Sequence, residues 1–257
     1  MLGAAIGDIV GSRFEFDNYK ATDFQLFTAA SDFTDDTICT AAVADWVNRG
    51  CRDDLVPILQ SWCHRYPHPT GAYGGRFSSW IQAEQPQPYN SWGNGSAMRV
   101  SAVGWAFDSL DDVLHYAEQS AIVTHNHPEG IKGAQATAAA IFWARQGKGK
   151  DFIREQIETR FAYALNRSCD EIRPDYRFNE SCMHTVPEAL TAFLDSENFE
   201  HAIRLAVSLG GDSDTLAAIT GSVAEAYYRE IPQEMVRQAL EILPDELAEV
   251  LLAVKAK

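Results

Sequence analysis

Residues 210–229 of the chain, GGDSDTLAAITGSVAEAYYR, contain two patterns that recur in the rest of the sequence. From Asp214 onward the stretch is rich in alanine and lacks the alternation of β-branched and polar residues that is typical of a strand, so it predicts a helix over 214–229. Aspartate and hydroxyl side chains gather at 212–215, where this helix is expected to start. The stretch therefore predicts a helix that begins in an acidic cluster.

The same helical composition, with Ala, Leu, Glu and Gln between the breaks, is found along most of the chain and predicts an all-α fold. No composition break or repeat of fixed period divides the chain, so residues 1–257 are expected to form a single domain. Long irregular stretches are expected at 12–33, 65–95 and 165–184, and loops of that length are usually functional or mobile. The helices are expected over residues 36–48, 53–64, 96–107, 111–123, 130–146, 150–164, 185–194, 199–209, 214–229, 232–242 and 244–255.

The overall composition limits the class of protein. With 46% hydrophobic and 22% charged residues in 257, the chain is globular, and it is not a disordered, collagenous or disulfide-stapled protein. Its formal net charge of −15 repels phosphate backbones, so general binding to nucleic acid is not expected. A phosphorylated ligand would have to be bound by a metal ion, helix N-termini or loop amides.

The cysteines and the N-terminal sequence indicate the cellular compartment in which the protein is expected to work. Five cysteines without a Cys-x-x-Cys pair favour a reduced environment. The N-terminus lacks the basic region of a signal peptide, and no apolar run approaches the roughly 20 residues of a membrane-spanning helix. We therefore expect a soluble cytoplasmic protein without membrane association.

Two short clusters place carboxylates beside hydroxyls at helix starts: FTDDT at 33–37 and GGDSDT at 210–215. Hard oxygen ligands at this density suit Mg²⁺ or Mn²⁺, and two such clusters that meet in space could hold a pair of ions. Each cluster alone could instead cap its helix, because Thr, Ser and Asp are favoured at N-caps. The occurrence of two nearly matching clusters favours the metal interpretation.

A third stretch, GNGSAMR at 93–99, is a glycine-bearing turn that runs into a helix, and its free amides could bind a phosphate or a ribose. It is not a Walker A loop, because no Gly-Lys-Ser/Thr is present. The alternative is an ordinary glycine-rich turn with Ser96 as a cap. His125 and its neighbours could contribute imidazole groups to a ligand pocket. A zinc site is not favoured, because no His-Glu-x-x-His occurs.

Taken together, these segments resemble the ADP-ribosylglycohydrolases of the dinitrogenase reductase-activating type. The resemblance lies in GDIVG at 7–11 with Glu15 after it, FTDDT at 33–37, GNGSAMR at 93–99, Thr124-His125, and GGDSDT at 210–215. The segments occur in the family's order over residues 3–221. The resemblance implies an orthogonal all-α bundle with two Mg²⁺ or Mn²⁺ ions in a cleft, which removes ADP-ribose from a modified acceptor.

The resemblance also implies roles for individual residues. Glu15 would lie beside the metal ions on a mobile loop. The catalytic carboxylate would be that of Glu15, Asp35 or Asp36. The metal ligands would be Thr34, Asp35, Asp36, Asp212, Asp214 and Thr215. The residues near the diphosphate, the adenosine and the ribose would be Gly74, Gly75, Ser91, Trp92, Gly93, Asn94, Gly95 and His125.

The expected reaction is consistent with these residue types. Cleavage of a ribosyl C1–N or C1–O bond builds positive charge on the sugar, which nearby carboxylates stabilise, while metal ions can hold the ribose hydroxyls and activate water. The expected substrate is a mono-ADP-ribosylated protein, with arginine as the leading acceptor, or a modified small molecule, and the product is ADP-ribose. Two alternatives remain, a two-metal phosphoesterase and a non-catalytic ADP-ribose binder. A monomer is expected.

Overall fold

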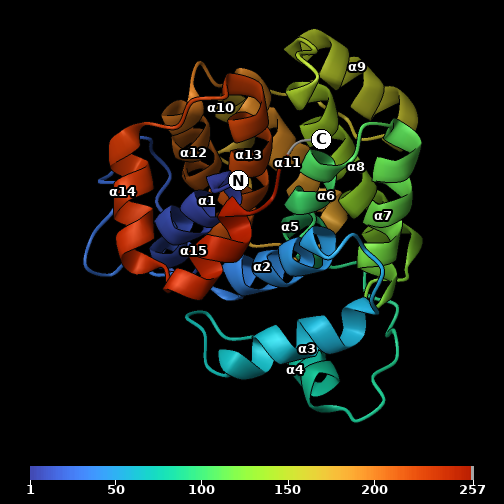
Figure 1. The fold of residues 1–257 in the computed structure, drawn as a ribbon. Coiled ribbons are helices and arrows are strands. Elements are labelled where there is room, and N and C mark those ends of the chain that lie inside the picture. Colours follow the sequence, from blue (N-terminus) through green and yellow to red (C-terminus); the bar gives the residue numbers. More distant parts are fainter. Residues whose placement is uncertain (256–257) are drawn as a thin grey trace.

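The computed structural model describes residues 1–255, which form an assembly of α-helices without a β-strand (Figure 1). Isolated bridges join Thr34 to Thr70 and Gly93 to Ser181. A 3₁₀ turn, η1 (Ser12–Phe14), follows the first helix. The helices are α1 (Gly3–Gly11), α2 (Asp35–Asn48), α3 (Leu55–Arg65), α4 (Gly75–Gln82), α5 (Gly95–Met98), α6 (Ser101–Ala106), α7 (Leu110–Ile122), α8 (Pro128–Arg145), α9 (Lys150–Phe161), α10 (Cys169–Ile172), α11 (Cys182–Asp195), α12 (Phe199–Ser208), α13 (Ser213–Tyr228), α14 (Gln233–Ile242) and α15 (Asp245–Leu252).

Helices α1 and α13 form the centre of the fold, and every residue of α1 is buried. Their backbones touch because α1 has a glycine at every fourth position. A Cβ atom on Gly7 would lie only 2.0 Å from the carbonyl oxygen of Ala217, and one on Gly3 only 2.3 Å from that of Gly221. This close packing brings the end of α1, and the loop after it, to the N-terminus of α13.

The other helices surround this pair. Helices α8, α11 and α12 pack on α13, while α2 packs against α3, α6 and α15. Figure 1 shows α3 and α4 together at one end of the molecule, beyond α2. Apolar side chains from α1 through α15 join in one continuous buried cluster. No helix within residues 1–255 combines the length and the apolar composition needed to cross a membrane.

The predicted all-α class is confirmed, and the differences lie in particular helices. Helix α1 was not predicted, because a helix that is buried on every side has no polar stripe to reveal its period. Helix α4 lies inside the stretch 65–95 that was expected to be irregular. The helix expected over 96–107 is broken between α5 and α6, and the helix expected over 185–194 begins at Cys182. These corrections reflect tertiary packing, which overrides local propensity.

Candidate functional site

A cavity of about 350 Å³ lies where several chain segments that are distant in sequence converge. Its walls come from the starts of α2 and α13, the loop after α1, the glycine segments around 71–75 and 93–95, and the loop before α11. The predicted site residues that line it are Glu15, Asp35, Asp36, Gly74, Gly75, Ser91, Gly93, Asn94, Gly95, His125, Asp212, Asp214 and Thr215.

The two acidic clusters meet in this cavity. Asp36, in the first turn of α2, accepts a hydrogen bond from the hydroxyl of Thr215 in the first turn of α13. Asp212 accepts a hydrogen bond from the amide nitrogen Nδ2 of Asn94 at 2.6 Å. Carboxylate oxygens of Glu15, Asp212 and Asp214 all lie within 4.8 Å of one another. The structure therefore joins clusters that are far apart in sequence into one acidic centre.

Burial makes this centre electrostatically costly without a cation. Desolvation raises the pKa of Asp35, Asp36 and Asp214 well above the ordinary range, and the neighbouring carboxylates raise it further. Within residues 1–255, neither Asp36 Oδ2 nor Asp214 Oδ1 has a hydrogen-bond partner, although both atoms are buried. Buried charges normally have a partner or coordinate a metal, so the two oxygens are available as metal ligands.

Thr34 lies behind the centre rather than on the cavity wall. Its side chain is fully buried, donates to Asp8 Oδ1 at 2.8 Å, and accepts a hydrogen bond from the backbone N–H of Asp36 as the N-cap of α2. Its role as a metal ligand therefore remains a prediction and rests on the remaining lone pair of its oxygen.

Sequence reasoning gave Asp8 no role. Its carboxylate accepts hydrogen bonds from the backbone N–H and the hydroxyl of both Thr34 and Thr37, at the N-terminus of α2. Burial outweighs these bonds and raises the pKa of Asp8 to about 6. The motif GDIVG at 7–11 was the available signal, and the structure shows that its acid anchors the start of α2 from the end of α1.

Glu15 follows η1 on a loop that is tied to the turn before α13. The side chain of Asn18 donates to the carbonyls of Phe14, Glu15 and Gly211 at 2.7, 3.1 and 2.9 Å, and accepts from the N–H of Gly211 at 2.7 Å. Burial, followed by the charges of Asp212, Asp8 and Glu180, raises the pKa of the Glu15 carboxyl to about 8. The loop that was expected to be mobile thus has a direct connection to the segment that carries Asp212.

Gly71 lies against the Glu15 carboxylate, in a backbone conformation that favours glycine. Gly71 has a positive φ of 80°, and a Cβ atom there would lie 2.8 Å from Glu15 Oε2. By contrast, Cβ atoms on Gly74 and Gly75 would meet nothing within 4 Å, so these glycines face open space. Gly74 is the N-cap of α4 and has no side-chain cap, so amides of the first turn lie at the cavity.

The segment 93–95 is held by the start of α11. The N–H of Asn94 donates to the carbonyl of Glu180 at 2.7 Å, and the N–H of Cys182 donates to the carbonyl of Trp92 at 3.0 Å. Trp92 itself is not on the main cavity. It lies on an adjoining groove with Phe178 and Glu180, is 47% exposed and contacts the ring of His127.

Several cavity residues had no predicted role. They include two cations, Arg76 and Arg99, and the aromatic side chain of Tyr89, over which the Arg76 guanidinium lies at 4.8 Å from the ring centroid. Arg99 was visible at the end of GNGSAMR, but its burial and its proximity to the cavity are tertiary properties. The cavity therefore combines an acidic centre with groups that suit an anion.

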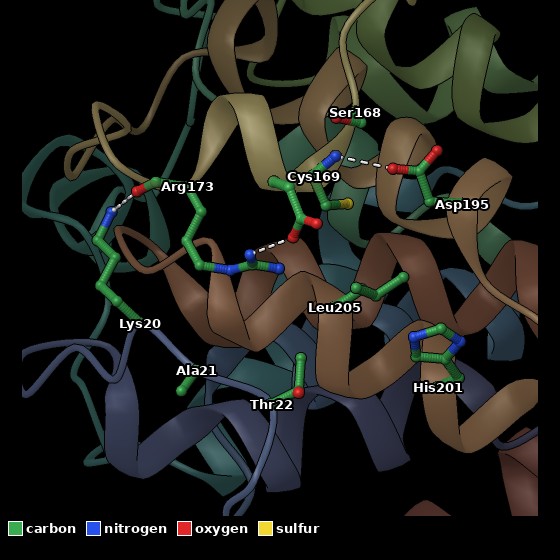
Figure 2. Close-up of a pocket in the computed structure, with 10 residues that line it drawn as sticks. Lys20, Ala21, Thr22, Ser168, Cys169, Arg173, Asp195, His201 and Leu205 are labelled. Carbon is green, nitrogen blue, oxygen red and sulfur yellow. Dashed lines mark hydrogen bonds and ion pairs between the residues drawn. The ribbon is translucent and has the colours of Figure 1, made fainter.

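A larger cavity of about 590 Å³ lies elsewhere, between the loop at 20–22, α10 and α12 (Figure 2). Its charged groups are already engaged within the protein. Lys20 donates to the carbonyls of Arg173, Tyr176 and Leu209, each at 2.7 Å, and Arg173 pairs with Asp170. The acidic centre is therefore the better candidate for chemistry, although its cavity is smaller.

Comparisons with known proteins identify the family to which the chain belongs. The family model for ADP-ribosylglycohydrolase matches residues 1–256. The ADP-ribosylhydrolase ARH3 of Xenopus tropicalis is 25% identical over 301 residues, covering 90% of this chain and 86% of its own length. The ADP-ribosylarginine hydrolase Tri1 of Pseudomonas putida is 27% identical over 259 residues, covering 89% of this chain and 69% of its own.

A solved structure described as an ADP-ribosylglycohydrolase-related protein complex has the same fold. It superimposes with a TM-score of 0.75 at 23% identity, covering 98% of this chain and 93% of that one. The resemblance seen in the sequence is thereby confirmed over the whole described chain. The protein belongs to the ADP-ribosylglycohydrolase family and is a hydrolase of ADP-ribosyl glycosidic bonds.

Proposed function

We propose that this protein removes ADP-ribose from modified arginine side chains, using two Mg²⁺ or Mn²⁺ ions held between the starts of α2 and α13. The observation that carries the proposal is the convergence of both acidic clusters on one cavity with buried, unpartnered oxygens on Asp36 and Asp214. A pair of divalent cations would offset the repulsion among these carboxylates.

The donor set fits such ions. All the candidate atoms are hard carboxylate or hydroxyl oxygens, which Mg²⁺ and Mn²⁺ prefer, and none is the thiolate or imidazole typical of zinc. The residues proposed to hold the ions are Asp35, Asp36, Asp212, Asp214 and Thr215, with Thr34 as a further candidate. When bound, the ions would supply positive charge beside the ribose hydroxyls and make a nearby water more acidic.

The remaining cavity groups would orient the rest of ADP-ribose. The uncapped first turn of α4, at Gly74 and Gly75, offers backbone N–H groups to a diphosphate. Arg76 adds a positive charge, and His125 adds a ring nitrogen. In this arrangement the ribose that carries the acceptor would lie at the acidic centre.

Glu15 is proposed as the carboxylate that takes a proton from the attacking water. Its carboxylate lies beside Asp212 and Asp214, on a loop held by Asn18. Breaking the C1 bond builds positive charge on the ribose, and the surrounding carboxylates would stabilise that charge. Asp35, which also lines the cavity, is the alternative base.

Arginine is proposed as the acceptor for two reasons. The relative from Pseudomonas putida is named an ADP-ribosylarginine hydrolase. In addition, Glu15 and Glu180 both line the cavity, and a guanidinium group is recognised well by carboxylates.

Mass spectrometry of the products tests this proposal. Peptides ADP-ribosylated on arginine or on serine are incubated with the protein in Mg²⁺, Mn²⁺ or EDTA. Release of intact ADP-ribose from the arginine peptide, stopped by EDTA, is expected. Release of AMP would indicate a phosphoesterase, release from the serine peptide alone would correct the acceptor, and release in EDTA would refute the role of the metal ions.

A further inference from the structure

Arg99 is a buried charged side chain at the cavity wall for which the proposed reaction has no use. It is 1% exposed. Within residues 1–255 its guanidinium donates to two neutral acceptors, the carbonyl of Ser120 at 2.7 Å and the hydroxyl oxygen of Thr124 at 2.8 Å. A buried arginine is costly to desolvate, so these bonds call for a functional explanation.

The next contact in the chain of hydrogen bonds is with His125. The hydroxyl oxygen of Thr124 lies 2.7 Å from His125 Nδ1. An arginine can only donate, so the Thr124 oxygen must accept from Arg99. The only acceptor that the hydroxyl hydrogen of Thr124 has within residues 1–255 is His125 Nδ1. If the Thr124 oxygen accepted from both Arg99 and His125, this fully buried hydroxyl hydrogen would have no partner, so it is assigned to a hydrogen bond that His125 Nδ1 accepts. A neutral His125 ring therefore carries its proton on Nε2.

Charge and burial favour the neutral ring. Desolvation lowers the pKa of His125 well below its ordinary value, and the positive charges of Arg99 and Arg76 lower it further. The ring is 5% exposed, and the centroid of the neighbouring Tyr89 ring lies 6.1 Å away.

His125 Nε2 faces the glycine segment that lines the cavity. A Cβ atom on Gly93 would lie 3.4 Å from Nε2, and one on Gly95 would lie 3.3 Å from it. Because both residues lack a side chain, nothing at these positions covers the ring edge. We call the hydrogen-bonded series Arg99, Thr124 and His125 the relay. The backbone carbonyl of Thr124 also accepts a hydrogen bond from the N–H of Tyr89 at 3.3 Å, which ties the relay to the loop before the glycine segment 93–95.

We propose that Arg99 and Thr124 are positioning residues that hold His125 as a neutral Nε2–H donor, aimed at an oxygen atom of the bound substrate. The identity of that substrate as an ADP-ribose derivative rests on the proposed function. The tautomer does not, because the relay consists of side chains of this chain alone.

Nuclear magnetic resonance of the imidazole nitrogens tests the tautomer without any ligand. In protein labelled with ¹⁵N-histidine, long-range proton–nitrogen correlations separate a protonated ring nitrogen from an unprotonated one. His125→Gln identifies the His125 signal by its loss. An unprotonated Nδ1 with a protonated Nε2 is expected at pH 7, and the opposite tautomer or a cationic ring would overturn the proposal.

Two substitutions at Thr124 test the relay itself. Thr124→Val keeps the shape and removes the hydroxyl, whereas Thr124→Ser keeps the hydroxyl and serves as the matched control. In Thr124→Val the Nε2–H tautomer is expected to lose its dominance, and the affinity for ADP-ribose, measured by calorimetry, to fall about tenfold. In Thr124→Ser both should remain within about twofold of the parent protein.

The outcomes separate this inference from the proposed function. A Thr124→Val protein that unfolds near the parent temperature, yet keeps both the tautomer and the affinity, would overturn the relay. If Thr124→Val fails to fold, the parent spectrum and Thr124→Ser still decide the tautomer. A parent protein with the expected tautomer that does not bind ADP-ribose would support the relay and refute the proposed ligand.

Discussion

Replacing Asp214 by asparagine should stabilise the metal-free protein while abolishing its response to metal ions. Asp214 is buried, and its Oδ1 has no hydrogen-bond partner within residues 1–255. One of its carboxylate oxygens lies within 4.8 Å of carboxylate oxygens of Glu15 and Asp212. Two unit charges 4.8 Å apart repel by about 3 kcal/mol at an effective dielectric constant of about 20. Asparagine has nearly the same shape and removes that charge.

The expected magnitudes can be measured by thermal unfolding. Relief of one such repulsion corresponds to an increase of up to about 6–12 °C in the Tm of the metal-free variant, at roughly 2–4 °C per kcal/mol for a chain of this size. In the parent protein, metal at about a hundred times its Kd adds roughly 2.7 kcal/mol, or about 5–11 °C. Asp214→Asn should show little of this second increase, and its turnover should be lost.

The assay compares both proteins in EDTA, Mg²⁺ and Mn²⁺ at pH 8, with exposed Asp175→Asn as the control that should match the parent. If the Tm of the parent protein is the same in EDTA, Mg²⁺ and Mn²⁺, the metal site is refuted. Strong destabilisation of Asp214→Asn in EDTA would show instead that the carboxylate is an essential structural partner.

Three further predictions concern the scaffold and the loop. Gly7→Ala should lower stability by about 3 kcal/mol in urea unfolding, because its Cβ would lie 2.0 Å from a backbone oxygen of α13. Gly149→Ala, at the N-cap of α9 with no atom within 4 Å of its Cβ, should cost no more than about 1 kcal/mol. Burial raises the pKa of Glu188 from 4.5 to about 7, so its folded form binds a proton more tightly than the unfolded form and stability declines as pH rises through that interval. Glu188→Gln should therefore be more stable than the parent at pH 8, by up to about 3 kcal/mol, and nearly equal to it below pH 4.5. Urea unfolding at both pH values measures this, and equal stabilities at pH 8 would contradict the prediction. Asn18→Ala removes the hydrogen bonds between the Glu15 loop and Gly211, so kcat should fall about tenfold with little change in KM. Steady-state kinetics measure both constants, and an unchanged kcat would show that these hydrogen bonds do not position Glu15.

The helical class and the positions of the acidic clusters could be predicted because both are local properties. Alanine-rich composition favours helices wherever it occurs. Thr34 and Asp212 stand at N-caps, so the starts of α2 and α13 were visible as capping residues followed by acids. The resemblance to the family also depended only on the order of short motifs along the chain.

The roles of Asp8, Asn18 and Arg99 were not predictable in this way. Each residue acts through partners that the fold supplies from elsewhere: Asp8 through Thr34 and Thr37, and Asn18 through Gly211. A side chain's type shows what it can bind, but it does not show which distant atom will lie within 3 Å of it. Helix α1 was missed because Gly3, Gly7 and Gly11 lower its helix propensity and its complete burial leaves no polar face.

The sequence by itself therefore determined the all-α class, most of the helices, the residue types of the two acidic clusters and the family. Only the tertiary structure decided that the clusters form one centre, because that depends on the close packing of α1 on α13 through Gly3 and Gly7. It also placed the Thr124 hydroxyl between Arg99 and His125, which is the arrangement behind the proposed tautomer. Burial, separation and proton position are properties of the packed molecule, and they turn the predicted residues into a site.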